Sequence, residues 1–182
     1  NEDDDLKQEG NIKLQAVLLA DALFGSKITK REDYQSFGLR PWSSEEYTNF
    51  QTLCKLNNLP IVDYILDFLA SNGVEQVIVV TGSESSQLED YLKAHNNKWN
   101  LEVLVVKDTS WTNAGDALRE VYKRNWIRAS KQALPFLLVS GDVVADLDLK
   151  DAMKAHKDRH SHDSAAVMTV VLKPTTTSST ST

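Results

Sequence analysis

Five short apolar runs, separated by stretches with helical spacing, constrain the possible folds of this chain most strongly. The runs cover residues 14–19, 75–81, 101–106, 135–140 and 165–172. A continuous apolar run of this length, bounded by turn residues, is typical of a strand that is buried on both faces. Parallel strands need long crossover connections, which the helical stretches between the runs can supply. The sequence therefore predicts an α/β fold with an open, doubly wound, mainly parallel sheet.

The helical stretches carry both periodicity and end signals. A helix is predicted to begin after Pro60 and to end before Gly73, a residue that suits a left-handed position after a helix. Its predicted inner face consists of Ile61, Val62, Ile65, Phe68 and Leu69. Further helices are predicted over residues 83–95 (inner residues Leu88, Tyr91 and Leu92), over residues 113–128 (inner residues Ala117, Leu118 and Val121) and after Asp148 as N-cap.

Composition and charge exclude several classes of function. The apolar share of 41% and the charged share of 25% are those of an ordinary soluble globular protein. The net charge of −6 argues against direct nucleic-acid binding through phosphate contacts. No apolar run approaches the roughly 20 residues that span a bilayer, so no membrane association is expected. A single cysteine, Cys54, fits a reducing compartment and favours a cytoplasmic location.

The two ends of the chain differ from the part between them. Residues 1–12 are acidic and lack the apolar stretch of a signal peptide, so we expect them to be disordered. The final segment PTTTSSTST, residues 174–182, has no apolar side chain and is predicted to be a tail or part of a truncated loop. The α/β domain, which we expect to be partial, is therefore placed at residues 13–173.

The segment AVLLADALFGSK, residues 16–27, is similar to the phosphate loop of a nucleotide enzyme. A strand ends at small residues, but a single glycine follows where such a loop needs several. We interpret the loop as a degenerate remnant of a nucleotide-binding loop, and its residues are Leu19, Ala20, Asp21, Ala22 and Gly25. Two further loops, around Asn113 and at Gly141-Asp142, also follow predicted strands, and ligands of doubly wound sheets bind at that edge.

Several longer stretches then resemble a known family. AVLLAD, LPIVDYILDFLASNGVEQVIVVTG and FLLVSGDVVADLDL are similar to the nucleotidyltransferase domain of sugar-nucleotide pyrophosphorylases. Within that group, LLAD, GDALREV, VSGDVV and AVMTVVLK resemble the epsilon subunits of eukaryotic translation initiation factor 2B. The resemblance covers about residues 14–173. It implies the N-terminal part of a Rossmann-like nucleotidyltransferase fold.

The resemblance also implies a role in assembly rather than catalysis. The family role is that of a scaffold and interaction domain in the guanine-nucleotide exchange factor that acts on initiation factor 2. The implied partners are the other subunits of that factor, especially the gamma subunit, and initiation factor 2 itself. The resemblance thus places the chain in a multisubunit complex of the translation machinery.

Active family members need loop glycines, basic residues and two aspartates around Mg²⁺, and the chain departs from each of these. Asp21 and Ala22 replace the glycine pair, Gln51-Thr52 replaces a Lys-Pro pair, and Asn113-Ala114-Gly115 replaces a base-contacting segment. Asp142 is the only remnant of the metal site, and its family partner would lie beyond residue 182. We therefore predict no catalytic residue and no cofactor.

Two alternatives stay open on the sequence alone. The first is an active sugar-nucleotide pyrophosphorylase, similar to mannose-1-phosphate guanylyltransferase, which would use Mg²⁺ and a variant phosphate loop. The second is a regulatory domain that binds a nucleotide or sugar phosphate without turnover.

A few residues outside these motifs raise separate questions. His156 and His160 are four residues apart with His162 nearby, a spacing that metal sites use, but the charged context AHKDRHSHD favours a solvated helix end. Trp42 and Trp111 lie in predicted loops and are candidates for an interface, although most single aromatic residues serve packing. Cys54 has no histidine at a family-like position, which argues against a catalytic thiol.

Overall fold

The computed structural model describes residues 14–20, 51–82, 86–111, 113–127 and 135–172. The elements in chain order are β1 (Gln15–Leu19), a 3₁₀ turn η4 (Gln51–Leu53), β2 (Lys55–Leu56), β3 (Leu59–Pro60), α1 (Ile61–Ser71), β4 (Gln76–Thr81), α2 (Gln87–Ala94), β5 (Glu102–Lys107), α3 (Ala114–Lys123), β6 (Leu137–Ser140) and α4 (Lys150–His162). The described residues fall into two units that divide between Leu147 and Asp148.

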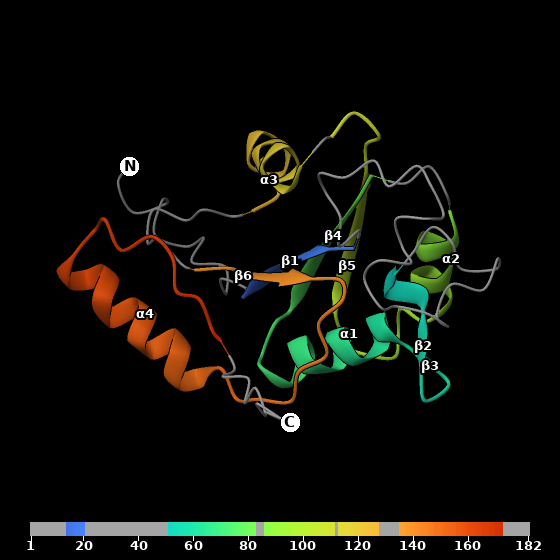
Figure 1. Cartoon of the computed structure of the whole chain (residues 1–182), viewed down its shortest axis with the longest axis horizontal. Helices are drawn as coiled ribbons and strands as arrows, with labels where there is room; N and C mark the ends of the chain where they lie inside the picture. Colours follow the sequence, from blue (N-terminus) through green and yellow to red (C-terminus); the bar gives the residue numbers. More distant parts are fainter. Residues whose placement is uncertain (1–13, 21–50, 83–85, 112, 128–134, 173–182) are drawn as a thin grey trace, which may run out of the picture. The chain divides into compact units, whose positions relative to one another are not determined.

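The first unit contains a four-stranded parallel sheet in the order β5-β4-β1-β6 (Figure 1). β1 pairs on one side with β4 and on the other with β6, while β4 pairs with β5 on its far side. Every residue of β4 is buried, as expected for a central parallel strand. Four of the five predicted strands are thus confirmed, and so is the α/β class with its parallel sheet.

The two faces of the sheet bury separate hydrophobic clusters. Side chains of a strand alternate between faces, so Ala16 and Leu18 enter one cluster while Val17 enters the other. The first cluster is covered by α1 and α2, and the second by α3. Figure 1 shows α3 on the opposite side of the sheet from α1. The predicted inner faces of all three helices contribute to these clusters, which confirms their periodicity.

Helix α1 begins and ends where its sequence signals predict. Pro60 is the N-cap residue, and Gly73 follows the C-cap with a φ of +78°, a conformation that glycine adopts without a Cβ penalty. The amide of Gly73 donates to the carbonyl of Ala70, and the amide of Val74 donates to the carbonyl of Leu69. This pair of bonds is a Schellman motif, and Val74 and Leu69 share the same hydrophobic cluster.

Helix α3 ends earlier than its apolar pattern predicts. It covers Ala114–Lys123 rather than residues 113–128. Asn125 has a φ of +53°, and the amide of Trp126 donates to the carbonyl of Val121. The helix therefore closes with an asparagine in the left-handed position, which turns Trp126 back onto the cluster under α3.

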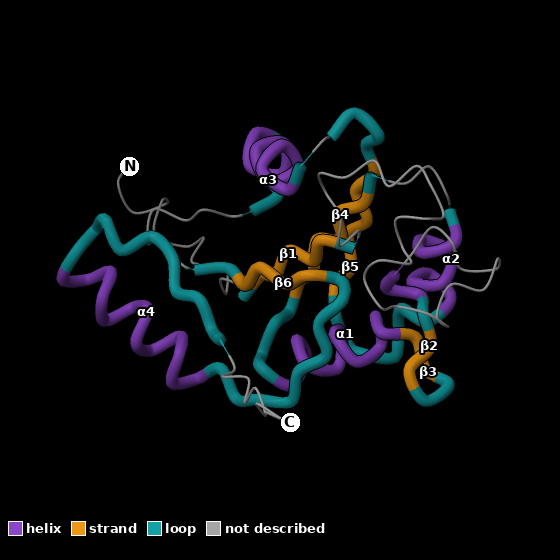
Figure 2. Tube along the Cα trace, in the orientation of Figure 1, coloured by secondary structure: helices purple, strands orange, loops and turns teal. Residues whose placement is uncertain are grey.

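The prediction of a fifth strand at residues 165–172 is wrong for the described chain. These residues form no strand, and Figure 2 draws them as loop. Val167, Val170 and Leu172 are 78%, 61% and 82% exposed. A strand is stable only when a neighbour accepts its backbone hydrogen bonds, and no described strand pairs with this run. Its amides instead make local bonds, such as that from Ala166 to the carbonyl of Asp163.

Helix α4 lies in the second unit and differs from the other helices. None of its own residues is buried. Its N-cap residue is Leu149 rather than the predicted Asp148, although Asp148 Oδ1 accepts the Lys150 amide at 2.9 Å. The predicted capping interaction thus exists, displaced by one residue.

Candidate functional site

The ends of β1 and β6 meet at the carboxyl edge of the sheet, where the sequence places a nucleotide-binding remnant. The amide of Ala20 donates to the carbonyl of Val80 at 2.9 Å, and the amide of Gly141 donates to the carbonyl of Leu19 at 2.8 Å. Ala20 is fully buried, whereas Leu19 is partly buried against the cluster under α3. Backbone hydrogen bonds to β4 and to the turn after β6 therefore hold the chain in place at the end of β1.

Gly141 packs closely against this position. A Cβ atom at residue 141 would lie 2.6 Å from the Ala20 carbonyl oxygen, 2.6 Å from Thr52 Cγ2 and 2.8 Å from the Leu19 carbonyl oxygen. Real Cβ atoms do not approach other atoms so closely, so the contact requires glycine because of space rather than φ. The end of β1, the turn after β6 and Thr52 are thus packed directly on one another.

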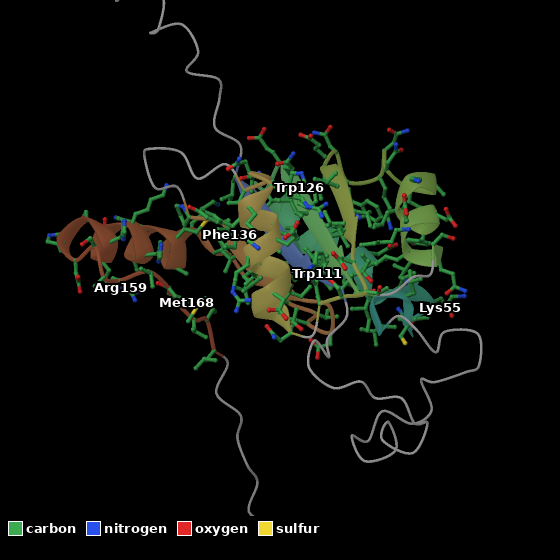
Figure 3. The ribbon with its side chains drawn as sticks, turned by 90° about the horizontal axis from the view of Figure 1, so that it is seen from above. Lys55, Trp111, Trp126, Phe136, Arg159 and Met168 are labelled. Carbon is green, nitrogen blue, oxygen red and sulfur yellow. The ribbon has the colours of Figure 1, made fainter. Side chains whose placement is uncertain are left out.

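Thr52 fills this junction from the 3₁₀ turn η4. Its side chain is fully buried, and its Oγ1 atom has no hydrogen-bond partner among the residues that the structure describes. The resemblance places a Lys-Pro pair at Gln51-Thr52, so a small buried side chain occupies the second position of that pair. The next lysine in sequence, Lys55, opens the β2–β3 hairpin, where its side chain is exposed (Figure 3).

The structure brings together only some of the predicted site residues. Leu19 and Ala20 lie beside Gly141 and its neighbour Asp142. Asp21, Ala22 and Gly25 lie outside the described residues. Three of the five predicted loop positions are therefore not placed by the structure.

The described residues do not fit a magnesium site. The Asp142 side chain is exposed, and its Oδ1 accepts a hydrogen bond from Ser140 Oγ at 2.6 Å. Magnesium bound between phosphates needs carboxylates held in near-octahedral geometry. Within the described part of the chain, no three His, Cys, Asp or Glu side chains are grouped closely enough to hold an ion. Asp142 therefore acts here as an acceptor for its own turn.

Side chains from the first turn of α3 form hydrogen bonds at its N-terminus. Asn113 Oδ1 accepts the Asp116 amide at 3.0 Å, and Asn113 Nδ2 donates to Asp116 Oδ2 at 2.9 Å. Arg119 donates to the other Asp116 oxygen. Free amides at a helix start can bind phosphate, but here the Asn113 side chain caps one of them, and Asp116 takes up the Arg119 guanidinium. The missing side chain of Gly115 leaves no free space here, because a Cβ atom at that residue would lie 3.0 Å from Asn113 Oδ1.

An open hollow of about 270 Å³ lies beside this cap. It is lined by Asp108, Ser110, Trp111, Asp116, Arg119, Glu120 and Lys123. The hydroxyl and amide of Ser110 hold the pKa of Asp108 below its usual value. Glu120 pairs with Arg124, and Asp116 pairs with Arg119. The three carboxylates that line the hollow thus all bind groups of the chain itself.

Of the two tryptophans proposed for an interface, Trp111 packs partly against the cluster under α3. Figure 3 shows Trp111 and Trp126 near that helix. Trp42 lies outside the described residues. Cys54 is half-buried, and burial raises the pKa of its thiol, which disfavours the nucleophilic thiolate.

A polar network beneath α1 was not predicted from the sequence. Asp63 is 1% exposed and accepts hydrogen bonds from the Tyr91 hydroxyl at 2.8 Å and from Lys98 Nζ at 2.6 Å. Burial, together with the bond to Asp63, raises the pKa of Tyr91. The network ties α1 to α2 and to the loop before β5. The signal in the sequence was the acidic residue beside the apolar positions of α1.

None of the helices in the described part of the chain is long and apolar enough to cross a membrane.

Three curated proteins indicate what the chain is similar to. It is 36% identical over 127 residues to translation initiation factor eIF2B subunit epsilon of Dictyostelium discoideum, covering 68% of this chain and 17% of the relative. It is 30% identical over 165 residues to the protein of the same name in Schizosaccharomyces pombe, covering 88% of this chain and 21% of the relative. The chain thus spans about a fifth of the length of these two relatives.

A weaker match links the chain to an enzyme. Mannose-1-phosphate guanylyltransferase catalytic subunit beta of Drosophila pseudoobscura pseudoobscura is 26% identical over 122 residues, covering 67% of this chain and 32% of the relative. A family model described as nucleotidyl transferase matches residues 38–178, well over half of the chain. The parallel sheet with helices on both faces agrees with that match, and the chain belongs to the nucleotidyl transferase family.

Proposed function

We propose that this chain is a scaffold and interaction domain from the epsilon subunit of the translation initiation factor eIF2B, and that it does not itself transfer nucleotidyl groups. One observation carries the proposal: the two matches to epsilon subunits, at 36% and 30% identity, are stronger than the 26% match to a guanylyltransferase. In this role the chain would form part of a guanine-nucleotide exchange factor that acts on initiation factor 2.

The packing of the carboxyl edge supports a domain without nucleotidyl transfer. Nucleotidyl transfer depends on positioning the phosphates and neutralising their charge. At this edge Thr52 and Gly141 are packed onto the end of β1, and Asp142 is bonded to Ser140. At the α3 N-terminus the Asp116 carboxylate already accepts from Asn113 Nδ2 and pairs with Arg119, so it occupies donors that a phosphate would need.

The proposed partners are the other subunits of the exchange factor, especially the gamma subunit, together with initiation factor 2. This assignment rests on the family resemblance and on the names of the relatives. The proposed location is the cytoplasm, where translation initiation takes place. Neither a cofactor nor a nucleic acid is required for such a role.

Co-purification tests the proposed partners. The 182-residue chain is expressed with a tag together with the gamma subunit of the same organism, and the eluate is analysed by mass spectrometry. We expect the gamma subunit to co-purify in near-stoichiometric amount. The matched bait is the same organism's mannose-1-phosphate guanylyltransferase subunit, used in an identical experiment. Equal recovery of gamma on both baits, or on neither, would contradict the proposal.

An active pyrophosphorylase is the second candidate, because the family match and the guanylyltransferase relative both favour it. The full-length protein is incubated with GTP, mannose 1-phosphate and Mg²⁺, and pyrophosphate release is measured. We expect none above the enzyme-free rate. Pyrophosphate production that requires both substrates would establish the enzyme and overturn the scaffold.

Binding without turnover is tested separately by calorimetry with GTP, GDP and GDP-mannose. A scaffold gives no saturable heat with any of the three. A saturable signal, without pyrophosphate release, would instead support a regulatory nucleotide-binding domain.

A further inference from the structure

Helix α4 presents two imidazoles on one of its faces. His156 and His160 are separated by four residues, and side chains at that spacing are neighbours on a helix. Their ring centroids lie 6.3 Å apart, with an angle of 5° between the ring planes. Both residues are half-buried, whereas His162 is exposed. The pair is therefore distinct from the solvated helix end that the sequence context favours.

The orientation of His156 is fixed by a residue outside the helix. Its Nδ1 atom lies 3.0 Å from the hydroxyl of Thr169, which belongs to the stretch after α4. Figure 3 shows this stretch at Met168, the residue before Thr169, with Arg159 labelled on the helix. A hydrogen bond at one ring nitrogen sets the tautomer and orients the other nitrogen, and metal-binding histidines are commonly held in this way.

We propose that His156 and His160 form a two-histidine site for a late first-row divalent ion, with Thr169 as the group that positions His156. Two histidines at this helical spacing are the arrangement that zinc-binding helices use. Imidazole nitrogen suits zinc, copper and nickel, whereas magnesium and calcium prefer oxygen. Within the described residues no third His, Cys, Asp or Glu joins the pair, so water completes the coordination and the affinity is modest.

The order of affinity follows from the ligand set. For nitrogen ligands the affinity rises from nickel to copper and falls again at zinc. We therefore expect Cu²⁺ to bind most tightly, Ni²⁺ and Zn²⁺ more weakly, and Mg²⁺ not at all. This site lies on α4 and is independent of the proposed scaffold function, which involves no metal.

The experiment titrates the full 182-residue chain with CuCl₂, NiCl₂, ZnCl₂ and MgCl₂ in a calorimeter. The chain has four histidines, so four single variants test every imidazole: His95→Ala, His156→Ala, His160→Ala and His162→Ala. We expect one Cu²⁺ per chain in the wild type, and at least a tenfold weaker affinity in His156→Ala and in His160→Ala. His95→Ala and His162→Ala should bind as the wild type does.

A positioning variant and a structural readout complete the test. Thr169→Val should weaken Cu²⁺ binding roughly tenfold, the lower end of the effect of removing such an outer partner. None of these five side chains is buried, so circular dichroism should show wild-type helix content in every variant. Unchanged affinity in His156→Ala or His160→Ala, or loss of binding in His162→Ala, would overturn the site.

Discussion

Two apolar, valine-rich runs of this chain differ in structure, because one forms a buried strand and the other forms no strand. The run QVIVVT forms β4, and all six of its residues are buried. The run AAVMTVVL at residues 165–172 forms no strand, and its residues Met168 and Val171 are 71% and 53% exposed. The difference is the presence of neighbours, because β4 pairs with β1 on one side and with β5 on the other. An apolar run thus indicates the capacity to form a strand, whereas pairing decides whether one forms.

Helix α1 of the sheet unit and helix α4 of the second unit show the same difference in burial. α1 buries five residues, including one carboxylate, whereas α4 buries none. Single substitutions in the sheet unit should therefore change the free energy of unfolding strongly. Most single substitutions in the unit that begins at Asp148 should change it little.

Truncation of a core residue should separate the two runs most clearly. Ile78→Ala removes a fully buried side chain from β4 and should lower the free energy of unfolding by about 2–5 kcal/mol. Val170→Ala, in the exposed run, should change it by less than about 0.5 kcal/mol. Urea unfolding monitored by circular dichroism measures both. Similar losses for the two variants would show that residues 165–172 are buried in solution.

Removal of a cation should distinguish the ion pairs of the two units. Lys98→Met leaves the Asp63 carboxylate, which is 1% exposed, with the Tyr91 hydroxyl as its remaining side-chain partner among the described residues. The substitution should cost about 2–3 kcal/mol.

The matched control is Lys150→Met. It breaks the pair with Asp148, whose side chains are 81% and 62% exposed, and should leave the unfolding midpoint unchanged because exposed pairs contribute little. Equal effects of the two substitutions would mean that burial of Asp63 does not set the strength of its pair.

A methyl group at Gly141 should disturb the closed edge of the sheet. Gly141→Ala forces its Cβ to within 2.6 Å of the Ala20 carbonyl oxygen, so the backbone must shift, at a cost of about 1–3 kcal/mol. The neighbouring Asp142→Ala removes an exposed side chain and should have no measurable effect. Thermal unfolding of the pair measures the difference. A Gly141→Ala variant as stable as the wild type would refute the tight packing.

Replacement of Thr52 by valine should stabilise the fold, whereas the preceding Gly141→Ala substitution should destabilise it. Its buried Oγ1 has no hydrogen-bond partner within the described part of the chain, and Thr52→Val exchanges that oxygen for a methyl group of similar size. Removing an unpaired buried polar atom should raise the free energy of unfolding by up to about 1 kcal/mol. Thr52→Ser, which keeps the hydroxyl and loses the methyl, is the matched control and should destabilise. A loss of stability in Thr52→Val would mean that the hydroxyl has a partner in solution.

The smallest effect should appear as a dependence on pH. Hydrogen bonds from Lys107 and Lys93 lower the pKa of Glu89 from 4.5 to about 2. Because the folded pKa lies below the unfolded one, the stabilisation is complete above pH 4.5 and is lost as the pH falls towards 2. Glu89→Gln should therefore flatten the acid side of the stability curve between these values, measured by urea unfolding at a series of pH values. An unaltered curve would show that both ion pairs are absent in solution.

Much of the fold was predictable because it depends on signals within a few residues. The alternation of Ala16, Val17 and Leu18 between two clusters follows from the strand period of two. Pro60, Gly73 and Asn113 mark helix ends through their own dihedral preferences and side-chain oxygens. Of the candidate site, the sequence located Leu19, Ala20 and Asp142 at the carboxyl edge, since strand ends of a parallel sheet share one edge.

Contacts between distant residues were decided only by the tertiary structure. The partners of Asp63 lie 28 and 35 residues away, and Gly141 meets the end of β1 and Thr52. The contact of Thr169 with His156 likewise crosses a turn. Residues 165–172 have the composition of a strand, but composition does not supply a neighbour. Local preference therefore determined which elements can form, whereas pairing and close packing, which depend on where the chain places other segments, determined which of them are buried.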